Sequence, residues 1–98
     1  MNIRKEASGD TAKYYLEGRL DTTTAPELEA ALQEGGDIKT LVLDFEKLSY
    51  ISSAGLRVLL SAQKRANASG STMTLKNVSE EIMEVFDMTG FSSFLTIE

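Results

Sequence analysis

Residues 48–60 read LSYISSAGLRVLL and lead from a polar connection into an amphipathic helix. At 100° per residue, one broad face of a helix over residues 53–68 is apolar and the opposite face carries cations. The apolar face holds Leu56, Leu59, Leu60, Ala62, Gln63 and Ala66, and the outer face holds Arg57, Ser61, Lys64 and Arg65. We therefore expect a half-buried helix with a basic outer stripe that ends just before Gly70.

Outward from this helix, strands and helices alternate along the chain. Strands are expected at residues 2–7, 11–19, 38–45, 72–76 and 94–97. A first helix is expected between Thr24 and Gly35-Gly36, where Thr24 with Glu27 fits a capping box, and a third between Ser79 and Gly90. This order predicts a single α/β domain over residues 1–98. Its mostly parallel sheet has an antiparallel strand pair at the N-terminus and about three helices packed on it.

The start of the middle helix differs from the other two because its first turn, SSAGL, contains no acidic residue. The first helix has Glu27 at this point, and the third has Glu80 and Glu81. Uncompensated N–H groups at a helix start favour an anion, and phosphorylation gives a serine roughly two negative charges. The alternative is that Ser52 or Ser53 is only an N-cap, which stabilises a helix by about 1 kcal/mol.

The composition restricts the chemistry that the chain can perform. Its 98 residues contain no cysteine and no histidine, which excludes disulfides, thiolate and imidazole metal sites and serine–histidine triads. We expect no cofactor and no metal. The net charge of −5 argues against a nucleic-acid partner. Since no apolar run approaches the roughly 20 residues of a membrane span, and no secretion signal is present, we expect a cytoplasmic protein without membrane insertion.

Four segments, taken in order, resemble the STAS domain of bacterial anti-sigma factor antagonists. They are GRLD at 18–21, the apolar strand that ends at Asp44-Phe45, YISSAGL at 50–56 and FDMTGF at 86–91. The similarity extends from Tyr15 to Phe91 and implies a STAS-like fold. It also implies a module that binds a protein partner and is controlled by phosphorylation.

The resemblance implies a particular phosphoacceptor. In this family the serine or threonine two places before the motif glycine is phosphorylated, and that position is Ser53 here. The preceding position, often Asp in the family, is Ser52, which makes Ser52 a competing acceptor. The implied cycle has three steps. The unphosphorylated chain binds an anti-sigma factor that is also a serine-protein kinase, and so frees a sigma factor; phosphorylation ends the binding; and a PPM-type serine phosphatase restores it.

The expected partner-binding residues surround this serine. Asp21 matches an acidic family position near the phosphoacceptor, or it is simply a polar turn residue, and Thr22 and Thr23 extend its loop. Ser52, Ser53, Ala54 and Gly55 form the helix start, where the missing side chain of Gly55 lets another backbone come close. Arg57 lies one turn beyond Ser53 and either pairs with a phosphate, contacts the partner or stays solvated.

For several other residues the sequence supports a role less strongly. Asp44, at the expected end of the central strand, is a secondary contact candidate. Met73, Met83, Met88, Phe86 and Phe91 are expected to fill the core. An enzyme that uses Ser53 with Asp21 or Asp44 is disfavoured, because the chain lacks a histidine, a nearby lysine base and a GxxxxGK loop. The competing functional hypothesis is a STAS subunit of another assembly, such as a sensory complex or the cytoplasmic component of a lipid or anion transporter.

Overall fold

A computed structural model describes residues 1–34 and 38–98. Its five-stranded sheet has the order β1-β2-β3-β4-β5. The strands are β1 (Asn2–Ser8), β2 (Thr11–Leu20), β3 (Thr40–Ile51), β4 (Thr72–Lys76) and β5 (Thr96–Ile97). β1 pairs with β2 in antiparallel fashion and the other described neighbours are parallel, which confirms the predicted fold class.

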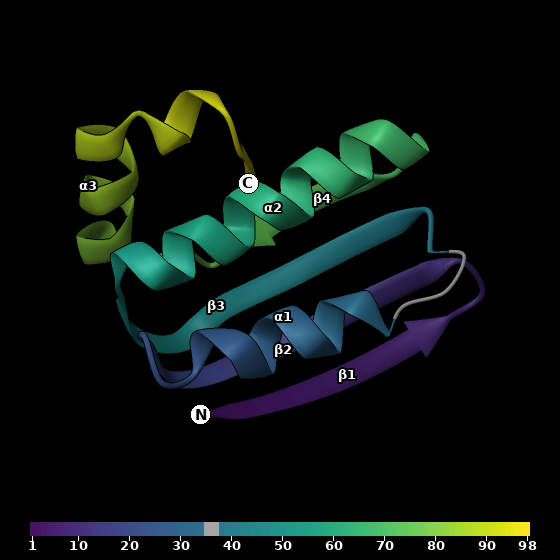
Figure 1. Ribbon diagram of the computed structural model, residues 1–98, viewed down its shortest axis with the longest axis horizontal. Coiled ribbons are helices and arrows are strands. Elements are labelled where there is room, and N and C mark those ends of the chain that lie inside the picture. Colours follow the sequence, from purple (N-terminus) through teal and green to yellow (C-terminus); the bar gives the residue numbers. More distant parts are fainter. Residues whose placement is uncertain (35–37) are drawn as a thin grey trace.

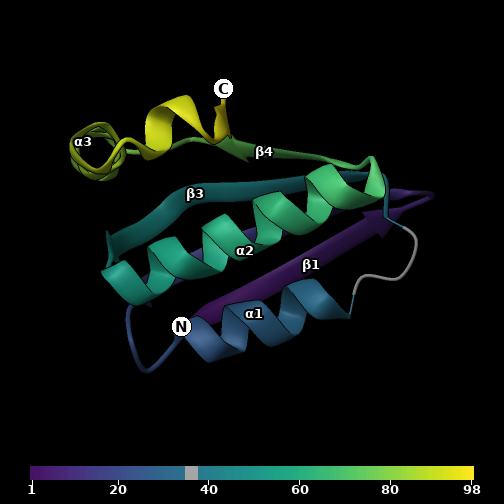
Figure 2. The same cartoon turned by 45° about the horizontal axis from the view of Figure 1, so that its top comes forward.

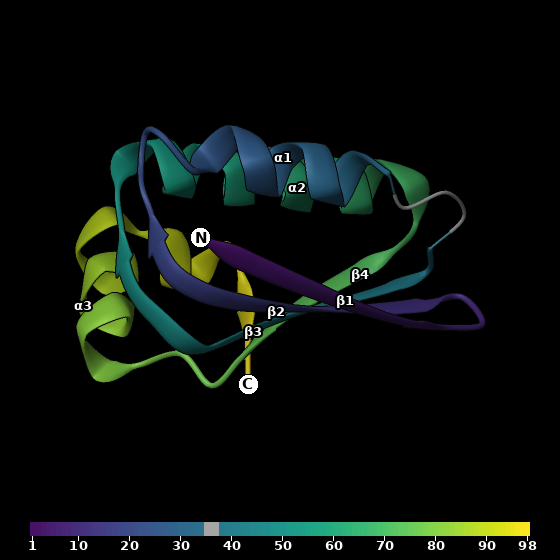
Figure 3. The ribbon, with the colours of Figure 1, turned by 90° about the horizontal axis from the view of Figure 1, so that it is seen from below.

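Two of the three α-helices cover one face of this sheet. α1 (Ala25–Gln33) and α2 (Ser53–Ser69) lie side by side on that face, and α3 (Glu80–Thr89) lies at one end of the sheet (Figures 1 and 3). The starts of α1 and α2 are at the same end of the molecule as α3 (Figure 2), and β2 and β3 finish at this end (Figure 3). The loop after β2 and the first turn of α2 are therefore neighbours.

The core lies between the sheet and the α1–α2 layer. Tyr14 and Leu16 of β2 are buried on this face, and the Tyr14 hydroxyl donates to the Ala31 carbonyl of α1 at 3.1 Å. The apolar face predicted for α2 is buried except for Leu60, which is half-buried. The three cations of the outer face are exposed and Ser61 is half-buried. Burial of such side chains contributes roughly 1.5–3 kcal/mol each, so packing of this face fixes α2 on the sheet.

β3 is longer than the sequence analysis predicted. The strand was expected to end at Phe45, but it continues to Ile51. Its register against β2 shifts twice, so that β3 has an extra residue between Asp44 and Lys47 and another between Leu48 and Tyr50. Such bulges bend a strand and interrupt the alternation of buried and exposed residues. That interruption explains why the prediction treated residues 46–51 as a connection.

The predicted capping box at Thr24 is wrong. The Thr24 hydroxyl donates to the Arg19 carbonyl at 2.7 Å and accepts from the Asp21 N–H at 2.9 Å, so it does not cap α1. The predicted end of this helix at Gly35-Gly36 lies outside the described residues. The N-caps of α2 and α3 are Ser52 and Ser79, each accepting a backbone N–H within the first turn.

The C-terminal part of the chain departs from prediction in two places. Residues Phe91–Ser93 form a 3₁₀ helix, so the strand predicted at 94–97 is only Thr96–Ile97. Met88 is 88% exposed, so its predicted core role is wrong. Phe86 is buried against Phe45 as predicted, whereas Phe91 is half-buried and packs on the rim of the core. Met73 is buried and Met83 packs partly against the core, as expected.

Candidate functional site

The two serines at the start of α2 occupy different environments. Ser52 is half-buried: its N–H donates to the Leu20 carbonyl at 2.9 Å, and its Oγ accepts from the Gly55 N–H at 3.4 Å. Ser53 is the first residue of the helix and is exposed. Its hydroxyl makes no hydrogen bond with any residue in the described part of the chain. The capping role therefore belongs to Ser52, and the hydroxyl available for chemistry belongs to Ser53.

The loop after β2 is organised by the carboxylate of Asp21. Its Oδ1 accepts the N–H groups of Thr23 at 3.0 Å and Thr24 at 3.1 Å, and its Oδ2 lies 3.7 Å from Arg19 Nε. The hydrogen bond from the Thr24 backbone is the largest influence, and it lowers the pKa of Asp21 below its usual value. Asp21 is therefore ionised near neutral pH and holds the loop in shape, while Thr22 and Thr23 remain exposed.

A hollow of about 280 Å³ lies between the starts of α1 and α2. It brings together three residues predicted to contact a partner, Thr22, Ala54 and Arg57. Its remaining lining residues are Ala25, Pro26, Glu29 and Val58, which the sequence analysis did not propose. The topology could have indicated these residues, because successive crossover helices of a parallel sheet begin at the same edge of the sheet.

The charge at the start of α2 is as predicted. The first turn of α2 carries no acidic residue, while α1 has Glu27 and α3 has Glu80 and Glu81. The helix start is thus electropositive through its own N–H groups. No group of acidic side chains able to hold a metal ion occurs in the described part of the chain, and none of the helices described there is long and apolar enough to cross a bilayer.

Packing inside the domain requires that residue 55 has no side chain. Gly55 is buried, and a Cβ at this position would lie 2.7 Å from Leu20 Cγ and 2.9 Å from Ile51 Cγ1. Leu20 is itself fully buried and Ile51 nearly so. The glycine therefore allows α2 to approach the ends of β2 and β3 closely, and its contact with a partner remains a prediction.

We predict that Gly55→Ala destabilises the domain by about 1–3 kcal/mol, because the added methyl group forces buried neighbours to move. Helix propensity alone would favour alanine by about 0.5–1 kcal/mol. The control is Ala68→Gly at an exposed position of α2, where only that propensity should count. Urea unfolding measures both variants, and a Gly55→Ala domain more stable than the wild type would contradict this packing.

The prediction that Asp44 lies at the end of a strand is wrong. Asp44 sits within β3 and is 6% exposed, on the sheet face opposite Tyr14 and the α1–α2 layer. Its carboxylate accepts the Glu46 N–H at 2.9 Å and the Asn77 Nδ2 at 3.0 Å, and lies 3.8 Å from Lys13 Nζ. It thus stabilises the first bulge of β3 and does not join Ser53.

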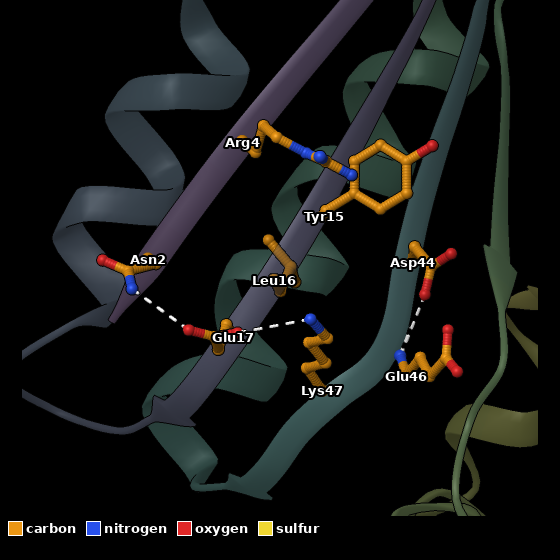
Figure 4. Close-up of a pocket in the computed structure, with 8 residues that line it drawn as sticks. All are labelled: Asn2, Arg4, Tyr15, Leu16, Glu17, Asp44, Glu46 and Lys47. Atoms are coloured by element: carbon orange, nitrogen blue, oxygen red, sulfur yellow. Dashed lines mark hydrogen bonds and ion pairs between the residues drawn. The ribbon is translucent and has the colours of Figure 1, made fainter.

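A second hollow, of about 430 Å³, adjoins Asp44 on this face (Figure 4). Four of its five charged side chains, Arg4, Glu17, Asp44 and Lys47, are already engaged within the domain. Arg4 stacks on Tyr15 with its guanidinium carbon 4.2 Å from the ring centroid, and Lys47 lies 3.8 Å from Glu17. The Ser53 region is therefore the better candidate site.

Comparison with known proteins gives a consistent assignment. The STAS domain family model matches residues 2–98. The anti-sigma-B factor antagonist of Listeria monocytogenes is 31% identical to the chain, over 100% of this chain and 90% of that protein.

Solved structures show the same fold. The anti-sigma factor antagonist SpoIIAA in its unphosphorylated form superimposes with a TM-score of 0.79 at 22% identity, covering 99% of this chain and 87% of that one. The phosphorylated form of the Bacillus cell fate determinant SpoIIAA gives a TM-score of 0.78 at 23% identity, covering 99% and 91%. The chain therefore belongs to the STAS domain family, among the anti-sigma factor antagonists.

Proposed function

We propose that this protein binds an anti-sigma factor when Ser53 is unmodified and releases it when Ser53 is phosphorylated. The observation that carries the proposal is the position of Ser53. Its hydroxyl is exposed at the first residue of a helix that lacks acidic residues, next to the Asp21 loop and the hollow between α1 and α2. The protein would act by binding, and we assign it no catalytic role.

Two relatives support this function. The Listeria protein is named an anti-sigma-B factor antagonist, and the SpoIIAA domain has been solved both without and with phosphorylation. A domain of this fold can therefore carry the modification. For this chain we infer a partner that is both anti-sigma factor and serine-protein kinase, a PPM-type serine phosphatase that removes the phosphate, and a cytoplasmic setting for all three.

The structure favours Ser53 over Ser52 as the acceptor. A kinase must reach the hydroxyl oxygen, and Ser53 is exposed whereas Ser52 is half-buried with its Oγ engaged by the Gly55 N–H. A kinase acting on Ser52 would also have to draw its Oγ away from the Gly55 N–H that it caps. A phosphate on Ser53 would instead lie beside the positive end of α2, where it is compatible with the fold.

Release follows from electrostatics. A phosphate brings roughly two negative charges into a surface that is covered when the partner docks. A desolvated charge without a matched counter-charge costs several kcal/mol. A cost of about 4 kcal/mol weakens affinity about a thousandfold, which is enough to end the association.

The experiment that tests this function is displacement of a sigma factor. A purified complex of the cognate anti-sigma factor and its sigma factor is mixed with the unphosphorylated protein and separated by gel filtration. We expect free sigma factor and a new complex that contains the anti-sigma factor. A sigma factor that stays bound at a large excess of this protein would overturn the proposal.

A further inference from the structure

The cations of this protein are divided between paired and unpaired positions. Four of them form ion pairs: Lys13 with Asp44, Arg19 with Asp21, Lys47 with Glu17 and Lys76 with Glu98. Arg4 and Lys5 lie over the rings of Tyr15 and Tyr14. The four that have neither kind of partner among residues 1–34 and 38–98 are Lys39, Arg57, Lys64 and Arg65. Three of these four belong to α2.

These three cations form a positive face on an acidic protein. α2 contains no aspartate or glutamate, so it carries +3, and because the net charge of the chain is −5 the remaining residues carry −8. Arg57, Lys64 and Arg65 are all exposed. No acidic residue of α2 offsets these cations, so a matching negative charge has to come from outside the helix.

The same face has a shallow groove of about 480 Å³ that follows α2. It is lined by Arg57, Leu60, Ser61, Lys64, Arg65 and Ala68. Leu60 is half-buried and so offers an apolar contact between the cations. Arg57 also lines the hollow between α1 and α2, so the groove and that hollow share this residue.

We propose that this groove on the outer face of α2 binds an acidic segment of the anti-sigma factor. Carboxylates of that segment would pair with Arg57 and Lys64, and an apolar side chain would cover Leu60. This inference rests on the proposed function and adds a partner chemistry to it. It also extends the contact surface from the first turn of α2 along the length of the helix.

Through Arg57, phosphorylation of Ser53 would affect partner binding in the groove. Arg57 lies one turn after Ser53, within reach of a phosphate on that residue. Such a phosphate would compete with the partner's carboxylates for Arg57, and its roughly two negative charges would offset most of the +3 of the helix. A nucleic acid or an anionic membrane fits less well, because each presents an extended anionic surface that the acidic remainder of the domain repels, whereas a short acidic segment contacts α2 alone.

The test compares Lys64→Glu with Lys39→Glu, two identical charge reversals at exposed lysines without partners in the described structure. Lys39 precedes β3 and lies outside the groove, so it is the matched control. Association of each unphosphorylated variant with the purified cognate anti-sigma factor is followed by stopped flow at about 50 mM and about 300 mM salt. We expect Lys64→Glu to associate about tenfold more slowly at low salt, with the difference shrinking at high salt, and Lys39→Glu to stay within about twofold of the wild type.

Equal association rates for the two variants would overturn the proposal that the groove binds the anti-sigma factor. The proposed function would stand if the wild type still displaces the sigma factor. Failure of the wild type to bind the anti-sigma factor would overturn both. Sedimentation with vesicles of phosphatidylglycerol and phosphatidylcholine supplies a further check. Vesicle binding by the wild type that Lys64→Glu abolishes would assign the groove to a membrane and refute an acidic protein segment.

Discussion

Ser53→Asp is expected to weaken binding to the anti-sigma factor about a hundredfold, while Ser53→Ala retains full affinity. The aspartate adds one negative charge to a surface that the partner covers, and a loss of about 2.8 kcal/mol corresponds to this factor. Isothermal titration calorimetry with the purified anti-sigma factor measures both variants. The alanine variant shows whether the hydroxyl itself is needed for docking.

Two features of the structure separate this effect from misfolding. An acidic residue in the first turn of a helix interacts favourably with the helix dipole, so Ser53→Asp is expected to keep or slightly raise stability in urea. Ser8→Asp is the matched control, because it makes the same substitution at an exposed serine at the end of β1, opposite the start of β2 and outside α2. A loss of affinity in Ser8→Asp as large as in Ser53→Asp would show that net charge, rather than position, controls binding.

The second expected result is an all-or-none difference in phosphate transfer. With the cognate kinase and ATP, the wild type and Ser52→Ala should incorporate phosphate, and Ser53→Ala should incorporate none. The reason is access, since the Ser53 hydroxyl is exposed and free of hydrogen bonds in the described structure while the Ser52 Oγ serves as the N-cap. Intact-protein mass spectrometry gives the stoichiometry and fragmentation gives the position.

Ser52→Ala also has a structural consequence that serves as an internal control. Loss of the N-cap should cost about 1 kcal/mol in urea unfolding without preventing phosphorylation. Ser53→Ala should unfold like the wild type, so its failure to accept phosphate cannot be attributed to stability. A phosphate found on Ser52 in the wild type would reverse the assignment of the two serines.

Much of the architecture was predictable because local signals and burial agreed. The periodicity of α2 identified its buried face, the glycine at its end marked its termination, and strand–helix alternation indicated a parallel sheet. The family resemblance placed Asp21 near Ser53, and the hydrogen bond from the Ser52 N–H to the Leu20 carbonyl confirms that these two segments meet.

The errors arose where a tertiary contact replaced a local pattern. Two bulges removed the alternation from the second half of β3, so Asp44 was placed at a strand end when it is buried within the strand. Thr24 matched a capping box, yet the Asp21 carboxylate binds the N–H groups of that loop. Met88 was expected in the core because methionine often fills core gaps, but α3 exposes it.

The candidate site was predicted only in part for the same reason. Thr22, Ala54 and Arg57 could be named from one segment each, but their meeting in a hollow with Pro26 and Glu29 depends on how α1 and α2 pack. Gly55 was expected to face a partner because its missing side chain lets another backbone come close. The structure shows that Leu20 and Ile51 occupy the space that a side chain would need.

The most direct measurement is the dissociation constant of the anti-sigma factor for two preparations of the native chain, one unmodified and one stoichiometrically phosphorylated on Ser53. The two extra negative charges should raise this constant about a thousandfold, and treatment with the phosphatase should restore the original value. If the phosphorylated preparation bound as tightly as the unmodified one, charge at the start of α2 would not control the partner.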